Sequence, residues 1–185
     1  MKIKPSVFVF LLFVFSSMQV KAQDENIFKP KYIKKVITQA AYWQLTNPRH
    51  ELWDWTNGAF YAGIFSAYKT TNDPKLLDAM LEMGAKNQWK PGPRLHHADD
   101  HVIGQTYINL FRLKKDSGMI KPFLDQINRF LETPFEAHGI EVITWWWCDA
   151  LFMAPPALVK LSVTTGDSKY MKMSDVLYQE CYDLL

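Results

Sequence analysis

Apolar side chains recur at steps of three and four residues along most of this chain, which is the spacing of an amphipathic helix. From Lys31 to Asn47 the repeat is unbroken and Pro48 then ends it, which predicts one helix with a stop. The same pattern predicts further helices over residues 57–69, 74–88, 98–114, 119–131, 147–161 and 169–185. Alternating apolar and polar residues, which would indicate strands, are nearly absent. The pattern therefore predicts an all-α protein.

The turns between the predicted helices also repeat. Residues 70–76 read TTNDPKL, residues 164–170 read TTGDSKY, and residues 115–118 form a looser copy. Asn72 and Gly166 stand where a left-handed helix end is required, and an aspartate that can cap the next helix follows each of them. The repeating unit is therefore a helical hairpin of roughly 45 to 50 residues, as in helical-repeat and toroid architectures. Three such hairpins are visible.

Three polar and aromatic clusters occupy equivalent places in these units. When the units are superimposed on the aspartate of each turn, Trp55, Asp99 and Asp149 fall at the start of each hairpin's first helix. Helices that pack side by side have axes ~8 to 10 Å apart. We therefore expect Asp99 and Asp149 to share one pocket on one rim of the fold.

The first residues have the three zones of a secretory signal peptide. Lys2 and Lys4 precede an apolar run over residues 7–15, and small and polar residues lead to Ala22, after which we expect cleavage. The run spans only ~14 Å as a helix, about half of a bilayer core, so a retained membrane anchor is not expected. We predict a signal peptide over residues 1–22 and a soluble protein that is periplasmic or secreted.

Composition and charge exclude several classes of partner. Of 185 residues, 48% are hydrophobic, and 21 Lys and Arg stand against 19 Asp and Glu, which is ordinary for one globular domain with a core. No basic run is present, so neither nucleic acid nor anionic lipid is an expected partner. Cys148 and Cys181 are too few for a disulfide scaffold. An oxidising compartment would permit one bridge, although free, buried thiols are expected.

Asp149 lies in the most aromatic stretch of the chain, directly after Trp145, Trp146, Trp147 and Cys148. Such surroundings remove water from a carboxylate and favour its protonated form, as a proton donor requires. Because successive helical residues turn by ~100°, at least one of the tryptophans should border the pocket or a neighbouring loop, where it could stack on a sugar. The alternative is that Asp149 only caps a helix in an aromatic core.

The second cluster contains Asp99 and Asp100, which are adjacent and so point to different faces of a helix. We expect only one to enter the pocket and choose Asp99 by its place in the repeat, with helix capping as the alternative. His97 and His101 lie four residues apart and could bind a metal with Asp100, but no convincing further ligand is near in the sequence. We expect structural histidines or donors to sugar hydroxyls, and no metal or cofactor.

Trp53 and Trp55 flank an aspartate in the remaining cluster. Core packing beside a helix cap is the ordinary interpretation, and a platform for a sugar is the alternative that we favour.

At these positions the chain resembles a known family. The segment HHADDHVIGQTY at residues 96–107 and the segment WWWCDALFMAPP at residues 145–156 resemble the unsaturated rhamnogalacturonyl hydrolases, glycoside hydrolase family 105, which is close to the unsaturated glucuronyl hydrolases of family 88. The segment WDWTNGAFYAG at residues 53–63 belongs to the same resemblance. It implies an (α/α)6 toroid of six hairpins, of which residues 23–185 would supply the N-terminal half, about three hairpins.

The resemblance also implies residue roles. The family's catalytic aspartate maps to Asp149, and its second functional aspartate maps to Asp99, with Asp100 as the alternative. The implied substrate is an unsaturated uronyl oligosaccharide made by polysaccharide lyases, and the implied reaction is hydration of its C4=C5 double bond. One carboxyl can act as acid and then as base, so no cofactor or metal is required.

Two other functions stay open on the sequence alone. One is a non-catalytic helical module that binds glycans through Trp53, Trp55 and the tryptophans at 145–147. The other is a metal-dependent hydrolase that uses His97 and His101.

Overall fold

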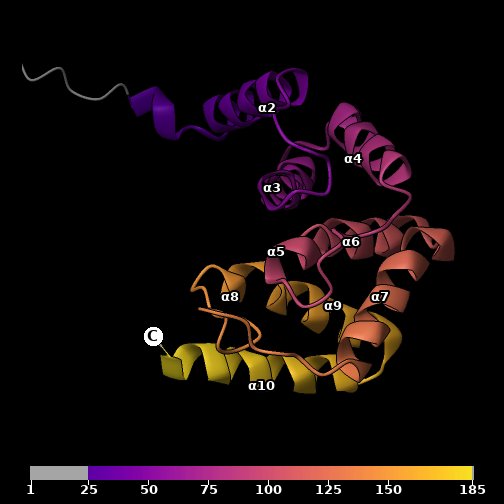
Figure 1. The fold of residues 1–185 in the computed structure, drawn as a ribbon. Helices are drawn as coiled ribbons and strands as arrows, with labels where there is room; N and C mark the ends of the chain where they lie inside the picture. The colour runs from indigo at the N-terminus through magenta and orange to yellow at the C-terminus, as the bar shows by residue number, and fades with distance from the viewer. Residues whose placement is uncertain (1–24, 185) are drawn as a thin grey trace, which may run out of the picture. The chain divides into compact units, whose positions relative to one another are not determined.

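The computed structural model of the protein describes residues 25–184 (Figure 1). They fall into two compact units, with the boundary between Val36 and Ile37. The first unit holds the 3-10 helix η1 (Glu25–Phe28) and the beginning of α2 (Pro30–Thr46). The predicted signal peptide, residues 1–22, lies outside the described residues.

The second unit is built from helices joined by turns and loops. They are α3 (Trp55–Thr71), α4 (Pro74–Lys86), α5 (Ala98–His101), α6 (Gly104–Lys114), η2 (Ser117–Met119), α7 (Lys121–Glu132), α8 (Ala150–Met153), α9 (Pro155–Thr165) and α10 (Lys169–Leu184). Residues 25–184 contain no strand, only an isolated bridge between His138 and Glu141. Within the same residues, no helix has the length and apolar character needed to cross a membrane. The predicted all-α class is confirmed.

The helices of the second unit form three consecutive hairpins (Figure 1). Helix α3 packs on α4 and α9 packs on α10, while η2 contacts both α6 and α7 in the middle hairpin. The first helices of the hairpins also pack in a row, because α3 contacts α5 and α6, α5 contacts α8, and α6 contacts α9. The starts of these first helices therefore meet on one rim, as the repeat predicts.

The turns explain why the hairpins are alike. Each first helix ends on a residue in the left-handed conformation: Asn72 (φ 58°), Lys115 (φ 62°) and Gly166 (φ 77°). The next residue is an aspartate whose side chain accepts a backbone hydrogen bond from two residues further on: Asp73 from Lys75 (3.0 Å), Asp116 from Gly118 (2.9 Å) and Asp167 from Lys169 (3.0 Å). The carboxylate satisfies an orphan donor at the start of the following helix.

Two predicted helices are interrupted. The helix expected over residues 98–114 is broken at Val102 and Ile103, where hydrogen bonds from Gln105 to Val102 (3.1 Å) and from Thr106 to Ile103 (3.0 Å) span only three residues. Such bonds tighten the turn relative to an α-helix. This break separates the four-residue helix α5 at the rim from the longer helix α6 in the core.

The helix expected over residues 147–161 begins only at Ala150 and breaks at Ala154, before Pro155 and Pro156. The sequence predicts a kink at these prolines because they lack a backbone N–H. The side-chain amide of Gln105 on α6 donates to the carbonyl of Phe152 at 3.1 Å and to the carbonyl of Met153 at 3.3 Å. A buried side chain thus satisfies carbonyls left free at the break.

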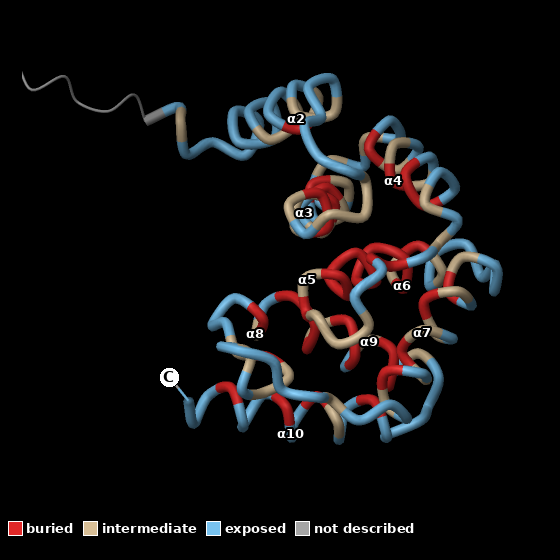
Figure 2. The backbone as a smooth tube through the Cα atoms, viewed as in Figure 1, coloured by how far each residue is buried: buried red, intermediate tan, exposed pale blue. Residues whose placement is uncertain are grey.

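The core is centred on α6 and the helices that surround it (Figure 2). Tyr107, Phe123 and Leu158, from three different helices, are completely buried. The backbone at Gly104 lies so close to the ring of Phe123 that a Cβ added there would collide with it. A side chain at this position therefore conflicts with the packing of α6 on α7.

We expect Gly104→Ala to destabilise the protein by about 1–3 kcal/mol, because the new Cβ would have to displace the fully buried ring of Phe123. Denaturant unfolding of both proteins measures the difference. Gly63→Ala is the matched control, since a Cβ at Gly63 on α3 meets nothing within 4 Å. It should be neutral or stabilising by up to about 1 kcal/mol. Equal effects of the two substitutions would contradict the prediction.

Candidate active site

The short helices α5 and α8 bring the two predicted carboxylates together. Asp99 lies in the first turn of α5 and Asp149 is the residue before α8, and these helices contact each other. Both aspartates line one small depression, together with Trp146 and Trp147. The spatial pairing expected from the repeat is therefore present.

Asp99 is held in a partly buried position beside two basic groups. Its side chain is 19% exposed, and its Oδ2 lies 3.5 Å from His97 Nδ1 and 3.7 Å from Arg94 Nη2. Burial raises the pKa of the Asp99 carboxyl; the charges of His97 and Arg94 lower it, and those of Asp149 and Asp100 raise it further. The net direction is upward, so Asp99 keeps a proton at higher pH than an ordinary aspartate.

Asp149 is more open than its sequence suggests. The residue is exposed, and its side chain makes no capping hydrogen bond to α8. The predicted enclosure by aromatic side chains is wrong, because Trp145 turns into the core and is 1% exposed while Trp147 is 55% exposed. All three tryptophans still line the depression with Asp149, but they leave this carboxylate open to solvent.

Asp100 is directed away from the depression. It is 1% exposed, and its carboxylate accepts hydrogen bonds from the backbone N–H of Arg94 at 2.6 Å, from Nε at 2.9 Å and from Nη2 at 2.5 Å. The backbone of Gly92 also approaches this carboxylate so closely that no Cβ would fit. The alternative assignment, with Asp100 as the second functional aspartate in contact with substrate, is therefore not supported, because its oxygens are already occupied.

The two candidate histidines have different surroundings. His97 lines the depression, whereas His101 is completely buried, packs edge-on against Phe130 and bonds through Nε2 to the carbonyl of Leu95 at 2.9 Å. Burial lowers the pKa of His101 to about 4, so this imidazole is neutral near pH 7. His101 is a structural residue, and a sugar contact is open only to His97.

A metal site through these histidines finds no support in their placement. In the part of the chain that the structure describes, no group of three or more His, Cys, Asp or Glu side chains is arranged to hold a metal ion. The third residue of the predicted set, Asp100, is already bound to Arg94.

Trp53 and Trp55 lie at the start of α3, where Asp54 caps the helix by accepting from the backbone N–H of Thr56 at 2.9 Å. Trp55 is 42% exposed, and Trp53 is half-buried. Neither tryptophan is among the residues that line the depression. The predicted sugar platform at these two positions is therefore not supported by their placement.

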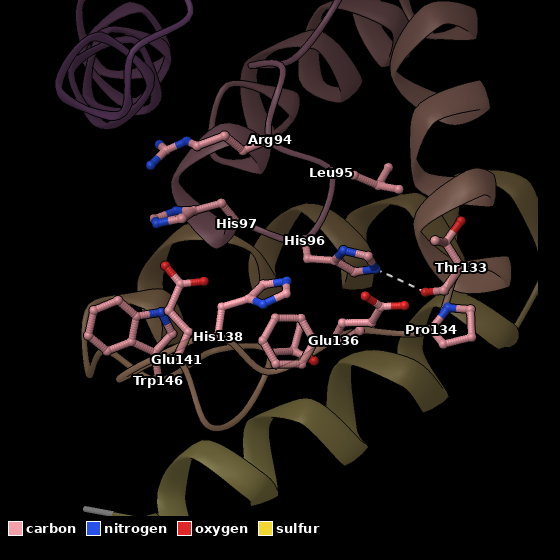
Figure 3. A pocket seen from close by; sticks show the side chains of 12 residues that line it. Arg94, Leu95, His96, His97, Thr133, Pro134, Glu136, His138, Glu141 and Trp146 are labelled. Carbon is pink, nitrogen blue, oxygen red and sulfur yellow. Dashed lines mark hydrogen bonds between the residues drawn. The ribbon is translucent and has the colours of Figure 1, made fainter.

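A larger cavity of about 440 Å³ adjoins the depression (Figure 3). His97, Thr144 and Trp146 line both. The wall opposite His96 and His97 comes from the loop between α7 and α8, which supplies Glu136, His138 and Glu141. The charged and imidazole groups of the cavity are Arg94, His96, His97, Glu136, His138 and Glu141.

Most residues of this cavity were missed by the sequence analysis. Its signal was the polar segment EAHGIE at residues 136–141, an unusual concentration of titratable groups in a loop that precedes the tryptophans. His96 is fixed within the cavity by a hydrogen bond from Nε2 to the carbonyl of Thr133 at 2.9 Å. It also packs edge-on against Phe130 and Phe135.

Comparison with known proteins finds a family model and relatives that match most of this chain. Residues 30–185 match the sequence model of the family described as Glycosyl Hydrolase Family 88. An unsaturated 3S-rhamnoglycuronyl hydrolase of Formosa agariphila is 34% identical over 184 residues, covering 92% of this chain and 48% of that protein. A protein of the same name from an Alteromonas species is 26% identical over 148 residues, covering 71% of this chain and 36% of that protein.

A solved structure named as a polysaccharide lyase superposes with a TM-score of 0.69 at 24% sequence identity, over 84% of this chain and 46% of that one. This likeness concerns the fold and agrees with the predicted six-hairpin class. The chain spans about half the length, or less, of each of these related proteins.

Proposed function

Because the chain belongs to glycosyl hydrolase family 88, we propose that its site removes a terminal 4,5-unsaturated uronic acid from lyase-generated oligosaccharides. The observation that carries this proposal is the pair of carboxylates in one depression, Asp99 from α5 and Asp149 from α8. One of them is partly buried with a raised pKa and the other is open to solvent. Two carboxyls in unlike surroundings can take different roles, one in proton transfer and the other in holding the sugar.

The proposed reaction is a hydration. The Asp149 carboxyl donates a proton to C4 of the unsaturated ring, and positive charge develops at C5 and the ring oxygen. The Asp149 carboxylate then accepts a proton from water as that water adds to C5. The resulting hemiketal opens and releases the rest of the oligosaccharide. The enzyme ends with its proton restored, and no covalent intermediate is needed.

Asp149 is the proposed donor although it is exposed without substrate. A sugar ring stacked beside Trp146 and Trp147 would cover the depression and exclude water from this carboxyl. Loss of water favours the protonated acid that the first step requires. Asp99 already lies beside His97 and Arg94, and its proposed role is to hold ring hydroxyls and stabilise the developing charge.

The adjoining cavity is the proposed place for the sugar on the other side of the cleaved bond. It shares His97 and Trp146 with the depression, and its volume of about 440 Å³ falls within the usual range for ligand pockets. His138 and Glu141 offer hydrogen bonds to sugar hydroxyls from the loop side. A substrate can therefore extend from the carboxylates into this space.

A rhamnose-linked uronyl group is the proposed substrate unit. The resemblance of the motifs to family 105 favours a pectic rhamnogalacturonan origin. The two named relatives act, by their names, on a rhamnoglycuronyl unit instead.

We also propose that the protein is exported, because residues 1–22 have the pattern of a signal peptide. Sequencing the N-terminus of the mature protein tests this proposal.

The test follows the ultraviolet absorbance of the conjugated C4=C5 bond. When the protein that carries this chain is mixed with lyase-generated disaccharides, the absorbance should fall, because hydration destroys the chromophore. Rhamnogalacturonan-type and rhamnoglycuronan-type disaccharides, compared in parallel, identify the preferred unit. A saturable binding signal with constant absorbance would instead identify a non-catalytic glycan-binding module. A chelator should not change the rate, because the proposed steps use no metal.

A further inference from the structure

The two cysteines of the chain meet where α10 passes the segment before α8. Cys181, on the C-terminal part of α10, is completely buried, and its thiol donates to the backbone carbonyl of Trp147 at 3.5 Å. The next residue along the chain is Cys148, which is exposed, and Asp149 follows it. The sequence predicts free, buried thiols and permits one bridge; Cys181 is buried as predicted, but Cys148 is exposed. Their proximity and their unequal exposure are findings of the structure.

The hydrogen bond limits how far apart the two cysteines can be. A carbonyl oxygen lies roughly 3 Å from the Cα of the following residue in a trans peptide, so the Cα of Cys148 lies within about 6.5 Å of the Cys181 sulfur. A disulfide requires a Cβ–Cβ separation of about 3.5–4.5 Å. Rotation of the exposed Cys148 side chain and a small shift of its turn can bring the sulfurs together.

The two thiols also differ chemically. Burial raises the pKa of the Cys181 thiol, and the nearby Cys148 and Asp149 raise it further. A thiol with a raised pKa that is also buried reacts slowly with external reagents. The exposed Cys148 is therefore the sulfur that an external oxidant reaches first.

We propose that Cys148 and Cys181 form an intramolecular disulfide that ties the Asp149 turn to α10 in an oxidising compartment. The oxidant is a low-molecular-weight disulfide such as glutathione disulfide. The Cys148 thiolate attacks one sulfur of the oxidant, forms a mixed disulfide and displaces one glutathione thiolate. Cys181 then gives up its proton and attacks the Cys148 sulfur, which releases the second glutathione. Two protein thiols are oxidised, and one glutathione disulfide is reduced to two thiols.

The test counts thiols in the full chain before and after incubation with glutathione disulfide. The reduced protein, once denatured, should show two free thiols, and the protein incubated with glutathione disulfide should show none. Peptide mapping of the oxidised protein without reductant should recover residues 148 and 181 in one cross-linked fragment. The oxidised protein should melt higher than the reduced protein by on the order of 10 °C, because the cross-link restricts the unfolded chain. Both measurements are independent of catalytic activity, so the function proposed above can fail without affecting them.

Single variants test the order of reaction. Cys181→Ser should stop at a stable mixed disulfide with glutathione on Cys148, whereas Cys148→Ser should leave Cys181 unmodified in the folded protein. Three results would overturn the proposal in the wild-type protein. They are two persistent free thiols, a glutathione adduct on Cys148 beside a free Cys181, and a dimer linked through Cys148. None depends on how well a variant folds.

Discussion

Replacing Asp149 with asparagine is expected to lower kcat on an unsaturated disaccharide by about 100-fold to 10,000-fold, the range that general acid–base catalysis contributes. Asparagine keeps the shape and hydrogen-bonding capacity of the side chain but cannot deliver a proton to C4. Substrate binding should change little, because the amide can still hydrogen-bond to the sugar. The start of α8 should not change either, because the exposed Asp149 side chain makes no capping bond to this helix. Steady-state kinetics and calorimetry on the same preparation separate the two effects.

Asp99→Asn is the matched comparison, since Asp99 lines the same depression. Its turnover and its affinity should fall together, because the proposed role includes holding the sugar before reaction. The raised pKa of Asp99 sharpens the contrast, because a proton donor at this position is the competing assignment. Near-normal turnover in Asp149→Asn together with collapse only in Asp99→Asn would exchange the two roles.

Removing the guanidinium of Arg94 should destabilise the fold by about 2–3 kcal/mol. Arg94→Ala leaves the carboxylate of Asp100 at 1% exposure with only the backbone N–H at position 94 as a hydrogen-bond donor. Breaking a buried ion pair typically costs about 3–5 kcal/mol, and the expected loss is smaller here because the Arg94 side chain is 50% exposed. The corresponding decrease in melting temperature is roughly 5 to 10 °C.

The control is an ion pair on the surface. Lys121→Ala removes a pair with Asp125 whose two side chains are 71% and 57% exposed, and it should cost less than about 1 kcal/mol. Arg94→Lys keeps the charge but loses the two-nitrogen contact, so it should fall between the two. If Arg94→Ala unfolds like Lys121→Ala, Asp100 is not held in the way the structure indicates.

The hairpin arrangement could be predicted because it depends on interactions between residues that are close in the sequence. Each turn combines a residue in the left-handed conformation, such as Asn72, with a capping aspartate, such as Asp73, and these interactions span two to four residues. Short-range geometry of this kind is readable from spacing alone. The pairing of Asp99 with Asp149 followed from the same register, because equivalent positions of stacked hairpins lie on one rim.

Side-chain direction within the clusters could not be predicted in the same way. Asp99 and Asp100 are neighbours on the same short helix, and it is the loop before them that buries Asp100 through Arg94 and Gly92. Likewise, the spacing of the residues does not show that Trp145 is buried while Asp149 stays exposed. These side-chain directions are determined by tertiary contacts, which produce no repeating pattern in the sequence.

The cavity beside the depression was hidden for a related reason. It is bounded by two loops, which supply Arg94 and His96 from one side and Glu136 and Glu141 from the other. Loops have no repeating pattern to place them, so their convergence becomes visible only in three dimensions. A concentration of titratable residues in a long connection is the one sequence feature that could have indicated it.

The two ends of the hairpins differ in how much sequence change they can tolerate. At one end the helices are joined by three short turns of nearly identical construction, each closed by an aspartate, and an insertion there would displace two packed helices. At the other end the longer connections over residues 87–97 and 133–149 carry the groups that face the cavity. We therefore expect changes in these connections to alter what the cavity accepts while leaving the packing of the hairpins unchanged. Grafting the 133–149 connection from a relative is accordingly the smallest transplant with which to try to alter selectivity.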